Sequence, residues 1–245
     1  MKKNCLNCEQ SIDGNFCSNC GQKASTKRYS LQHLFKHDLV HGIWHMDKGI
    51  LFTIKQLFTR PGHSIREYIQ GKRVNYFNFI TLIFIAIGIS GLLEYYSGIK
   101  LADIISSPKE VELYNTMQNF QDKYPKWIPV LTIPIYSLFS FLWFRKAQLN
   151  YSEHLVLNSY IVAAQLIIIL TFTIISVFYT DISGLFLIYS VIGFTSLIYS
   201  IWAYYQFFSG FSYKVLSLVC RTIAVPFTYF IFTLIIGMIL TKFSS

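Results

Sequence analysis

Four of the chain's five cysteines stand in two pairs near its beginning, with the spacing of a metal site. Cys5-x2-Cys8 and Cys17-x2-Cys20 each form a short knuckle, in which two thiolates can bind one cation. Four thiolates favour tetrahedral zinc, with Zn–S distances of about 2.3 Å. A site with four cysteine ligands has no open position, so the predicted zinc folds its surroundings and does not catalyse a reaction.

The short connection between the two pairs predicts a compact zinc ribbon over residues 1–26, with one zinc per chain. Gly21 follows the second pair and can adopt the positive φ of such a knuckle. Ile12 and Phe16 are expected to form almost the whole apolar core of the ribbon. Disulfides and an iron–sulfur cluster are the alternatives; a cytosolic location and the paired spacing favour zinc.

Histidines form a second pattern, recurring every four residues at His33, His37, His41 and His45. Each four-residue step advances about 40° around a helix, so the four lie on one face. Apolar residues occupy the other side of the same wheel, which predicts an amphipathic helix over 31–50 at the cytosolic membrane surface. The histidines then face headgroups or solvent.

The alternative interpretation of this row is a second metal site. Histidines at i and i+4 are a competent ligand pair on a helix. Glu153 and His154 directly precede the predicted span 155–179, at its end on the same predicted side of the membrane. The candidate ligands are His37, His41, His45, Glu153 and His154.

Two amides lie within that later apolar segment. Asn158 and Gln165 are seven residues apart and therefore share one helix face. Hydrogen bonds between helices are the simpler interpretation, and a path for a polar solute is the alternative.

These residues must be positioned by elements of a membrane protein. The chain is 53% apolar and 13% charged, against about 25% charged residues in soluble domains. This composition excludes an ordinary soluble enzyme and a disordered chain. About 20 apolar residues cross a bilayer as a helix, so we expect an all-α protein. Five spans are predicted, at 74–96, 127–144, 155–179, 182–206 and 217–241.

The charges predict how these spans are oriented. Residues 1–76 hold 12 of the 21 Lys and Arg residues, with only 5 acidic residues. Basic segments stay in the cytosol, so the N-terminus is expected inside and the C-terminus outside a bacterial inner membrane. The same charge predicts attraction to anionic lipid, and it favours lipid over nucleic acid as the partner.

The segment 27–73 links the ribbon to the transmembrane domain 74–245 and is expected to be helical and interfacial. Within it, 51–58 is rich in apolar residues and is interrupted at Pro61 and Gly62. Ser64-Ile65-Arg66-Glu67 matches a capping box, which predicts a short helix that opens there and ends at Gly71.

Several stretches together resemble a bacterial membrane protein family that is frequent in Bacteroidota and defined as a domain of unknown function. The resemblance is carried by residues 41–53, Arg60-Pro61-Gly62, residues 68–73, Cys20-Gly21-Gln22 and Glu153-His154-Leu155. It implies an N-terminal zinc ribbon on a membrane domain, and it implies no activity. The count of five spans is also similar to that of Yip-type membrane proteins.

The sequence contains no Gly-rich phosphate loop, no Gly-x-Ser-x-Gly elbow and no His-Glu-x-x-His motif. We therefore expect a non-enzymatic scaffold or an accessory in transport or lipid organisation. The zinc ribbon is expected to serve as a structural or protein-docking module. The alternatives are a membrane-embedded metalloenzyme at the His/Glu cluster and a small-solute or ion transporter.

Overall fold

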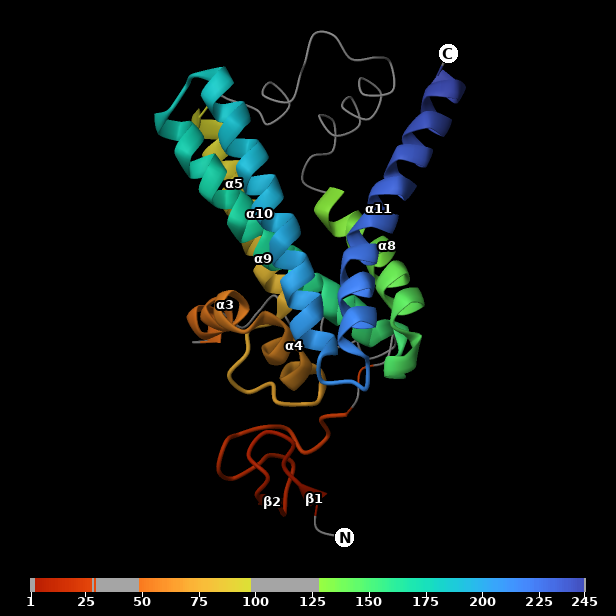
Figure 1. Ribbon diagram of the computed structural model, residues 1–245. Coiled ribbons are helices and arrows are strands. Elements are labelled where there is room, and N and C mark those ends of the chain that lie inside the picture. The colour runs from red at the N-terminus through yellow and green to blue at the C-terminus, as the bar shows by residue number, and fades with distance from the viewer. Residues whose placement is uncertain (1–2, 28, 30–48, 98–127, 245) are drawn as a thin grey trace.

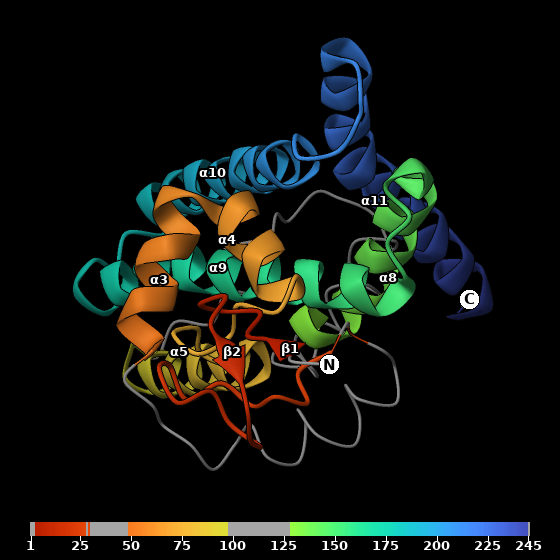
Figure 2. The ribbon, with the colours of Figure 1, turned by 90° about the horizontal axis from the view of Figure 1, so that it is seen from below.

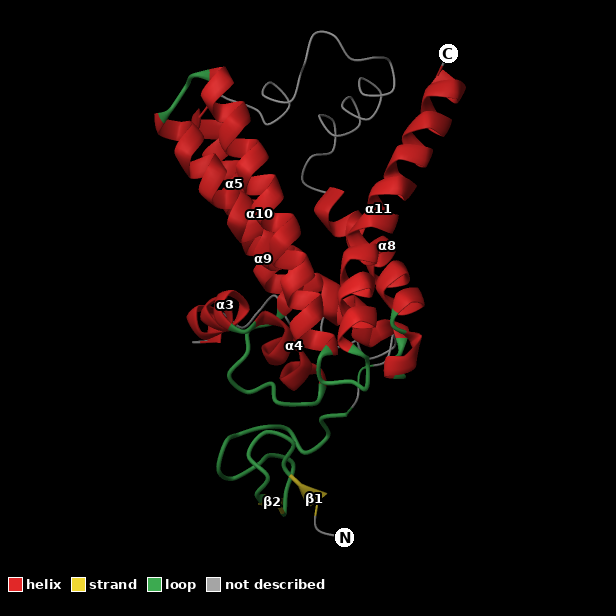
Figure 3. Cartoon of the chain, viewed as in Figure 1, coloured by secondary structure: helices red, strands yellow, loops and turns green. Residues whose placement is uncertain are grey.

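The computed structural model describes residues 3–27, 29, 49–97 and 128–244. The regular secondary structure of the described residues is helical apart from two very short strands in the N-terminal segment, and loops make up most of that segment (Figure 3). The elements are β1 (Lys3–Asn4), β2 (Ser11–Ile12), α3 (Gly49–Thr59), α4 (Pro61–Ile69), α5 (Phe79–Ser97), α8 (Ile128–Trp143), the 3-10 turn η2 (Arg145–Ala147), α9 (Tyr151–Phe178), α10 (Ile182–Phe208) and α11 (Val215–Ser244). The predicted all-α class is confirmed. The predicted helix over 31–50 lies outside the described residues, except for its last two.

Three helices are long and apolar enough to cross a bilayer: α9, α10 and residues 215–236 of α11. Two shorter apolar helical stretches cover 79–93 and 131–143, within α5 and α8. Helices of this length and apolar composition indicate an integral membrane protein.

The boundaries of the apolar helices differ from the predicted ones where polar groups cap them. The first begins at Phe79 and not at 74, because the Asn78 side chain accepts hydrogen bonds from the amides that follow it, such as Ile80 N at 2.8 Å. The third begins at Tyr151 and not at 155, because Asn150 and Glu153 form a capping box. An uninterrupted apolar run marks the middle of a helix, whereas caps determine its first turn.

The apolar helices form two arms that meet at one end and diverge toward the other (Figure 1). One arm contains α5, α9 and α10, and the other contains α8 and α11. At their joint, the rings of Phe144 and Phe208 stack with centroids 3.6 Å apart, and both side chains are fully buried. The ribbon lies beyond this joint, and α11 ends at the opposite end of the molecule (Figure 1).

Helices α3 and α4 form a wedge, residues 49–69, at the ribbon-side end of the first arm (Figure 2). Helix α4 packs so closely on α10 that a Cβ at Gly62 would lie 2.1 Å from Phe207 N. The Arg66 guanidinium donates to Phe207 O at 2.8 Å. A cation at the C-terminal end of α10 complements both the free carbonyls and the helix dipole there.

The predicted capping box at Ser64 is wrong. Helix α4 begins at Pro61, and its N-cap Arg60 makes no side-chain cap. The Ser64 hydroxyl lies inside the helix and donates to Pro61 O at 2.8 Å. The ring of a proline at the first helical position already holds φ near the helical value. Its missing N–H costs nothing there, because the first amides of a helix have no partner within the helix. Pro61 can therefore begin α4 without a capping side chain.

The N-terminal ribbon, residues 3–27, consists of two tight hairpins. Strands β1 and β2 pair antiparallel, with Lys3 opposite Ile12. Phe16 was expected in the ribbon core, but its side chain is 57% exposed. A unit this small cannot enclose a ring of that size, and its buried apolar side chains are instead Cys5 and Cys17.

Candidate metal centre and its attachment to the helices

The four predicted cysteines converge in the ribbon. Their Sγ atoms all lie within 4.8 Å of one another. The Sγ atoms of Cys5 and Cys20 are 3.5 Å apart, as are those of Cys8 and Cys17. A tetrahedron with Zn–S bonds of about 2.3 Å has edges of about 3.8 Å, so one zinc-sized cation fits this set. No other group of three or more potential ligands with this proximity occurs in the described part of the chain.

The two hairpins hold their cysteines by equivalent backbone hydrogen bonds. Cys5 N donates to Gln10 O and Cys17 N to Gln22 O, both at 2.8 Å. The residue after each second cysteine is left-handed, with φ of 65° at Glu9 and 75° at Gly21. The first hairpin therefore has a glutamate where the second has a glycine. Both hairpins adopt the same left-handed turn, although a side chain at Glu9 makes that backbone conformation less favourable than it is for glycine.

Hydrogen bonding and burial shift the pKa values of Cys8 and Cys20 in opposite directions. The backbone at Gln10, followed by the Asn19 side chain, lowers the pKa of Cys8 to about 6. Burial raises the pKa of Cys20 to about 11. A bound cation needs all four groups as thiolates, so binding releases protons and weakens as the pH falls.

The ribbon is attached to the helices by the residues that follow its last cysteine. Gln22 is 5% exposed, and its Oε1 accepts from the amide of Arg73 at 3.2 Å. The Arg73 guanidinium donates back to Lys27 O at 2.9 Å. On the other hairpin, Leu6 covers Gly71, where an added Cβ would lie 2.7 Å from Leu6 Cδ1. Both hairpins thus contact the turn between α4 and α5.

An aromatic contact extends this attachment. Tyr29 is 2% exposed and stacks on Tyr68 of α4, with ring centroids 6.0 Å apart. The Arg73 guanidinium lies 3.9 Å from the centroid of Tyr29, which is a cation–π geometry. The Asn150 amide donates to Tyr29 O at 2.8 Å, so the start of α9 is also bound.

A cavity of about 410 Å³ lies between the ribbon and the helices. Leu6 of the ribbon, Arg66 and Gln70 of α4, Glu153 of α9 and Phe207 of α10 are among its lining residues. The ribbon is therefore fastened through the 71–73 turn and Tyr29, and it does not fill the whole surface beneath it.

The predicted second metal site is described only in part. His37, His41 and His45 lie outside the described residues. Glu153 is 2% exposed and its Oε2 accepts from Asn150 N at 2.8 Å, so it serves the capping box of α9. His154 is fully buried, and its Nδ1 is 2.9 Å from Ser140 Oγ of α8.

His154 belongs to a buried polar network that joins three helices. The Asn158 amide donates to Ser140 Oγ at 3.0 Å and to His154 O at 2.7 Å. The Tyr204 hydroxyl of α10 donates to the Asn158 side-chain oxygen. His154 Nε2 has no hydrogen-bond partner among the described residues. The network lies close to the joint of the two arms and ties α8, α9 and α10 together there.

Gln165 makes a separate contact on the same helix. Its amide donates to Ser196 O of α10 at 3.3 Å. Asn158 and Gln165 therefore both bond to α10, while Asn158 also reaches α8.

Residue types alone did not identify the residues that attach the ribbon. Gln22, Arg73 and Tyr29 are ordinary polar and aromatic residues in the sequence, and their partners lie far along the chain. One signal was present: Gln22 is the last residue of Cys20-Gly21-Gln22. The structure gives that residue a role, since its side chain accepts from the helical domain.

Comparison with known proteins finds a family similarity in the wedge and the segments next to it. Residues 47–91 match the model of a family described as "Protein of unknown function (DUF3667)". The match covers α3, α4, the 71–73 turn that carries the ribbon, and most of α5. No curated protein and no solved structure matches the chain.

Proposed function

We propose that this chain is a non-enzymatic scaffold of a bacterial inner membrane, in which a zinc ribbon is held on the cytosolic end of five membrane-spanning helices. The observation that carries the proposal is the attachment of the ribbon through Gln22, Arg73 and Tyr29. A closed four-cysteine site that is fastened to a helical domain can present a rigid surface, but it offers no open position for catalysis.

The contacts of the polar groups in the helices support a structural role. Asn158 and Gln165 both bond to neighbouring helices. Such bonds stabilise association between helices by about 0.6 kcal/mol on average. A transport path would need polar groups that face an aqueous cavity instead.

The five-span arrangement makes a topological prediction. With an odd number of spans and a cytosolic ribbon, reporter fusions after residues 110 and 243 should both give extracytoplasmic signals. The positions of the ribbon and the end of α11 at opposite ends of the helices support this expectation. Paired alkaline phosphatase and fluorescent protein fusions measure it, and a cytosolic signal at either position would contradict it.

The attachment of the ribbon makes a second prediction. Arg73→Leu removes the guanidinium's bonds to Lys27 O and Tyr68 O and its cation–π contact with Tyr29. We expect trypsin to cleave about tenfold faster at Lys23 and Lys27, because losses of about 1–2 kcal/mol favour an undocked ribbon. Metal content should stay at one ion per chain.

The matched control is Lys72→Leu, which removes the same charge from the neighbouring, exposed position. Its cleavage rate should equal that of the wild type. Equal rates for Arg73→Leu and Lys72→Leu would show that Arg73 does not hold the ribbon, and the scaffold proposal would lose its main support.

A further inference from the structure

Helix α3 is buried along one side and exposes apolar side chains on the other. On the packed side, Leu57 is 1% exposed. On the opposite side, Leu51 is 76% exposed, and Phe52 and Phe58 are exposed by 36% and 37%. Lys55 is exposed as well, and at about 100° per residue these four side chains fall within an arc of about 120°. We call Leu51, Phe52, Lys55 and Phe58 the outer face of α3.

The contacts of α3 with the first arm determine where the outer face points. The Tyr199 hydroxyl of α10 donates to Leu57 O at 3.0 Å, and the rings of Tyr199 and Phe58 have centroids 5.8 Å apart. Thr53 Oγ1 accepts from Phe77 N, just before α5, at 2.7 Å. Helix α3 thus lies across the helices of this arm (Figure 2). Because its packed side contacts the arm, its outer face points away from the arm.

The position of Tyr199 along α10 gives the depth of α3 in a bilayer. Asp181 caps the other end of α10, where its carboxylate accepts from Gly184 N at 2.7 Å, and it is exposed. A charged group of this kind belongs outside the hydrocarbon core. Tyr199 follows 18 residues later, which is about 27 Å along a helix.

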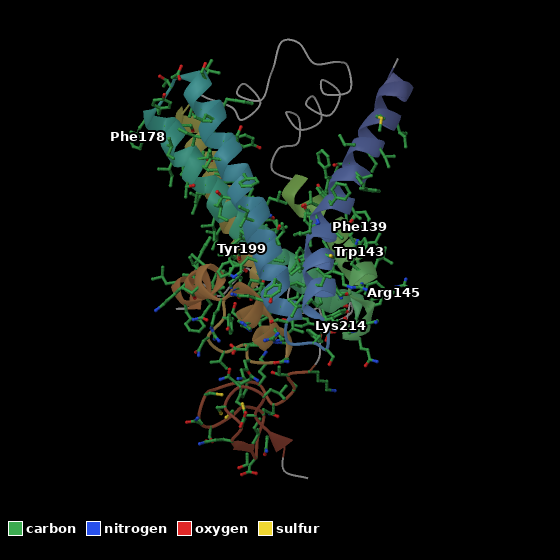
Figure 4. The ribbon with its side chains drawn as sticks, in the orientation of Figure 1. Phe139, Trp143, Arg145, Phe178, Tyr199 and Lys214 are labelled. Atoms are coloured by element: carbon green, nitrogen blue, oxygen red, sulfur yellow. The ribbon has the colours of Figure 1, made fainter. Side chains whose placement is uncertain are left out.

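The hydrocarbon core of a bilayer is about 30 Å thick, so α3 meets α10 close to the second boundary of that core. Figure 4 shows Tyr199 beside α3. Trp202 stands one turn further along α10, with its ring centroid 6.1 Å from that of Tyr199. Tyrosine and tryptophan are enriched at the level of the headgroups, which agrees with this depth.

We propose that the outer face of α3 lies in the lipid of the cytosolic leaflet, at the boundary between headgroups and acyl chains. This inference rests on the proposed membrane-spanning arrangement, and it makes phospholipid the partner of the wedge. Helices that lie in the interface bury their apolar face to a depth of about 5–10 Å. Leu51 and Phe58 then contact acyl chains, while the stem of Lys55 follows them and its ammonium group reaches the lipid phosphates.

The proposal explains why α3 keeps an apolar outer face. Water would have to surround Leu51 and two phenylalanine rings if this face lay in the cytosol, which is unfavourable. At the boundary of the leaflet the same side chains are surrounded by lipid. Helix α4 and the 71–73 turn follow α3 directly, so its contact with lipid would also fix the height of the ribbon above the membrane.

The test uses the full chain in vesicles of phosphatidylcholine and phosphatidylglycerol and measures quenching of a single tryptophan by brominated lipid. All four natural tryptophans are first changed to Phe: Trp44, Trp127, Trp143 and Trp202. Leu51→Trp then reports on the outer face, and Phe58→Trp repeats the measurement at its other end. Phe194→Trp, at a position of α10 that is 64% exposed, reports on the span, and Phe16→Trp reports on the ribbon.

Bromine is placed either just below the headgroup or near the ends of the acyl chains. We expect the shallow bromine to quench Leu51→Trp at least about twofold more strongly than the deep one. The opposite order is expected for Phe194→Trp, and no quenching for Phe16→Trp. Thermal unfolding in detergent shows whether each variant keeps the fold of the tryptophan-free parent.

Two outcomes would overturn the inference while the spans stand. One is quenching of Phe194→Trp together with none at Leu51→Trp and Phe58→Trp, which would place the outer face in water or against protein. The other is stronger quenching of Leu51→Trp by the deep bromine, which would place α3 within the hydrocarbon core. Absence of quenching at Phe194→Trp would instead contradict the proposed membrane-spanning arrangement itself.

Discussion

Replacement of Cys8 and Cys17 by serine is expected to remove one zinc ion per chain and to unfold the ribbon. Each hairpin then keeps one thiolate, and a serine hydroxyl is a poor ligand for zinc. Structural zinc contributes about 10–16 kcal/mol in small zinc-binding peptides at neutral pH. This ribbon has little else to hold it, since Phe16 and Leu6 are exposed by 57% and 43%. Elemental analysis of the purified protein measures the loss.

Cys220 supplies the control for this prediction, because it is exposed and lies outside the four-cysteine cluster. Cys220→Ser should keep one zinc per chain. An unchanged zinc content in the Cys8→Ser/Cys17→Ser protein would show that the metal binds elsewhere.

The same measurement separates the scaffold from the metalloenzyme alternative. A protein that uses the histidine row would bind a second ion, and His37→Ala/His41→Ala would remove it. The scaffold proposal expects one ion both in the wild type and in that variant.

Replacement of Gly62 by alanine is expected to destabilise the helical domain by about 3 kcal/mol, the upper end of typical overpacking costs. The added Cβ would lie 2.1 Å from Phe207 N and 2.5 Å from Ala203 O. Both are backbone atoms of α10, so no side-chain rotation can relieve the contact. Helix α4 would have to move away, which would weaken the bonds from Gly62 N to Gln206 and from Arg66 to Phe207 O.

Thermal unfolding in detergent measures this effect as a fall in the midpoint temperature. Gly88→Ala in α5 is the matched control, since a Cβ there meets nothing within 4 Å. We expect the control to unfold at or slightly above the wild-type temperature, because alanine favours helix. Equal midpoints for both variants would mean that α4 does not pack on α10 as described.

The features that could be predicted from the sequence are those that depend on neighbouring residues. Cys5, Cys8, Cys17 and Cys20 were identified from their spacing, because a knuckle of four residues determines where its own two thiols point. The apolar helices were predicted for a similar reason, since a continuous uncharged run cannot be placed in water. Their starts at Phe79 and Tyr151 could be predicted less well, because the caps made by Asn78 and Asn150 depend on single polar side chains.

The local sequence pattern at residues 64–67 gave a wrong prediction for the start of α4. Ser64-Ile65-Arg66-Glu67 has the spacing of a capping box, but α4 already begins at Pro61. In the folded chain Glu67 instead pairs with Arg60, at 3.0 Å, and accepts from the Tyr76 hydroxyl. Those partners are seven and nine residues away, beyond the range of a local motif.

The sequence by itself determined the chemistry that is available: four thiols for one cation, apolar helices for a bilayer, and an excess of positive charge near the N-terminus. Only the tertiary structure decided how these parts are joined. It placed Gln22 on Arg73, Gly62 against Phe207, and Arg221 of α11 against the end of α8. The physical reason is the separation of the interacting residues along the chain. A metal knuckle or an apolar helix is determined by residues close together in the sequence, whereas these contacts form only when distant segments pack together.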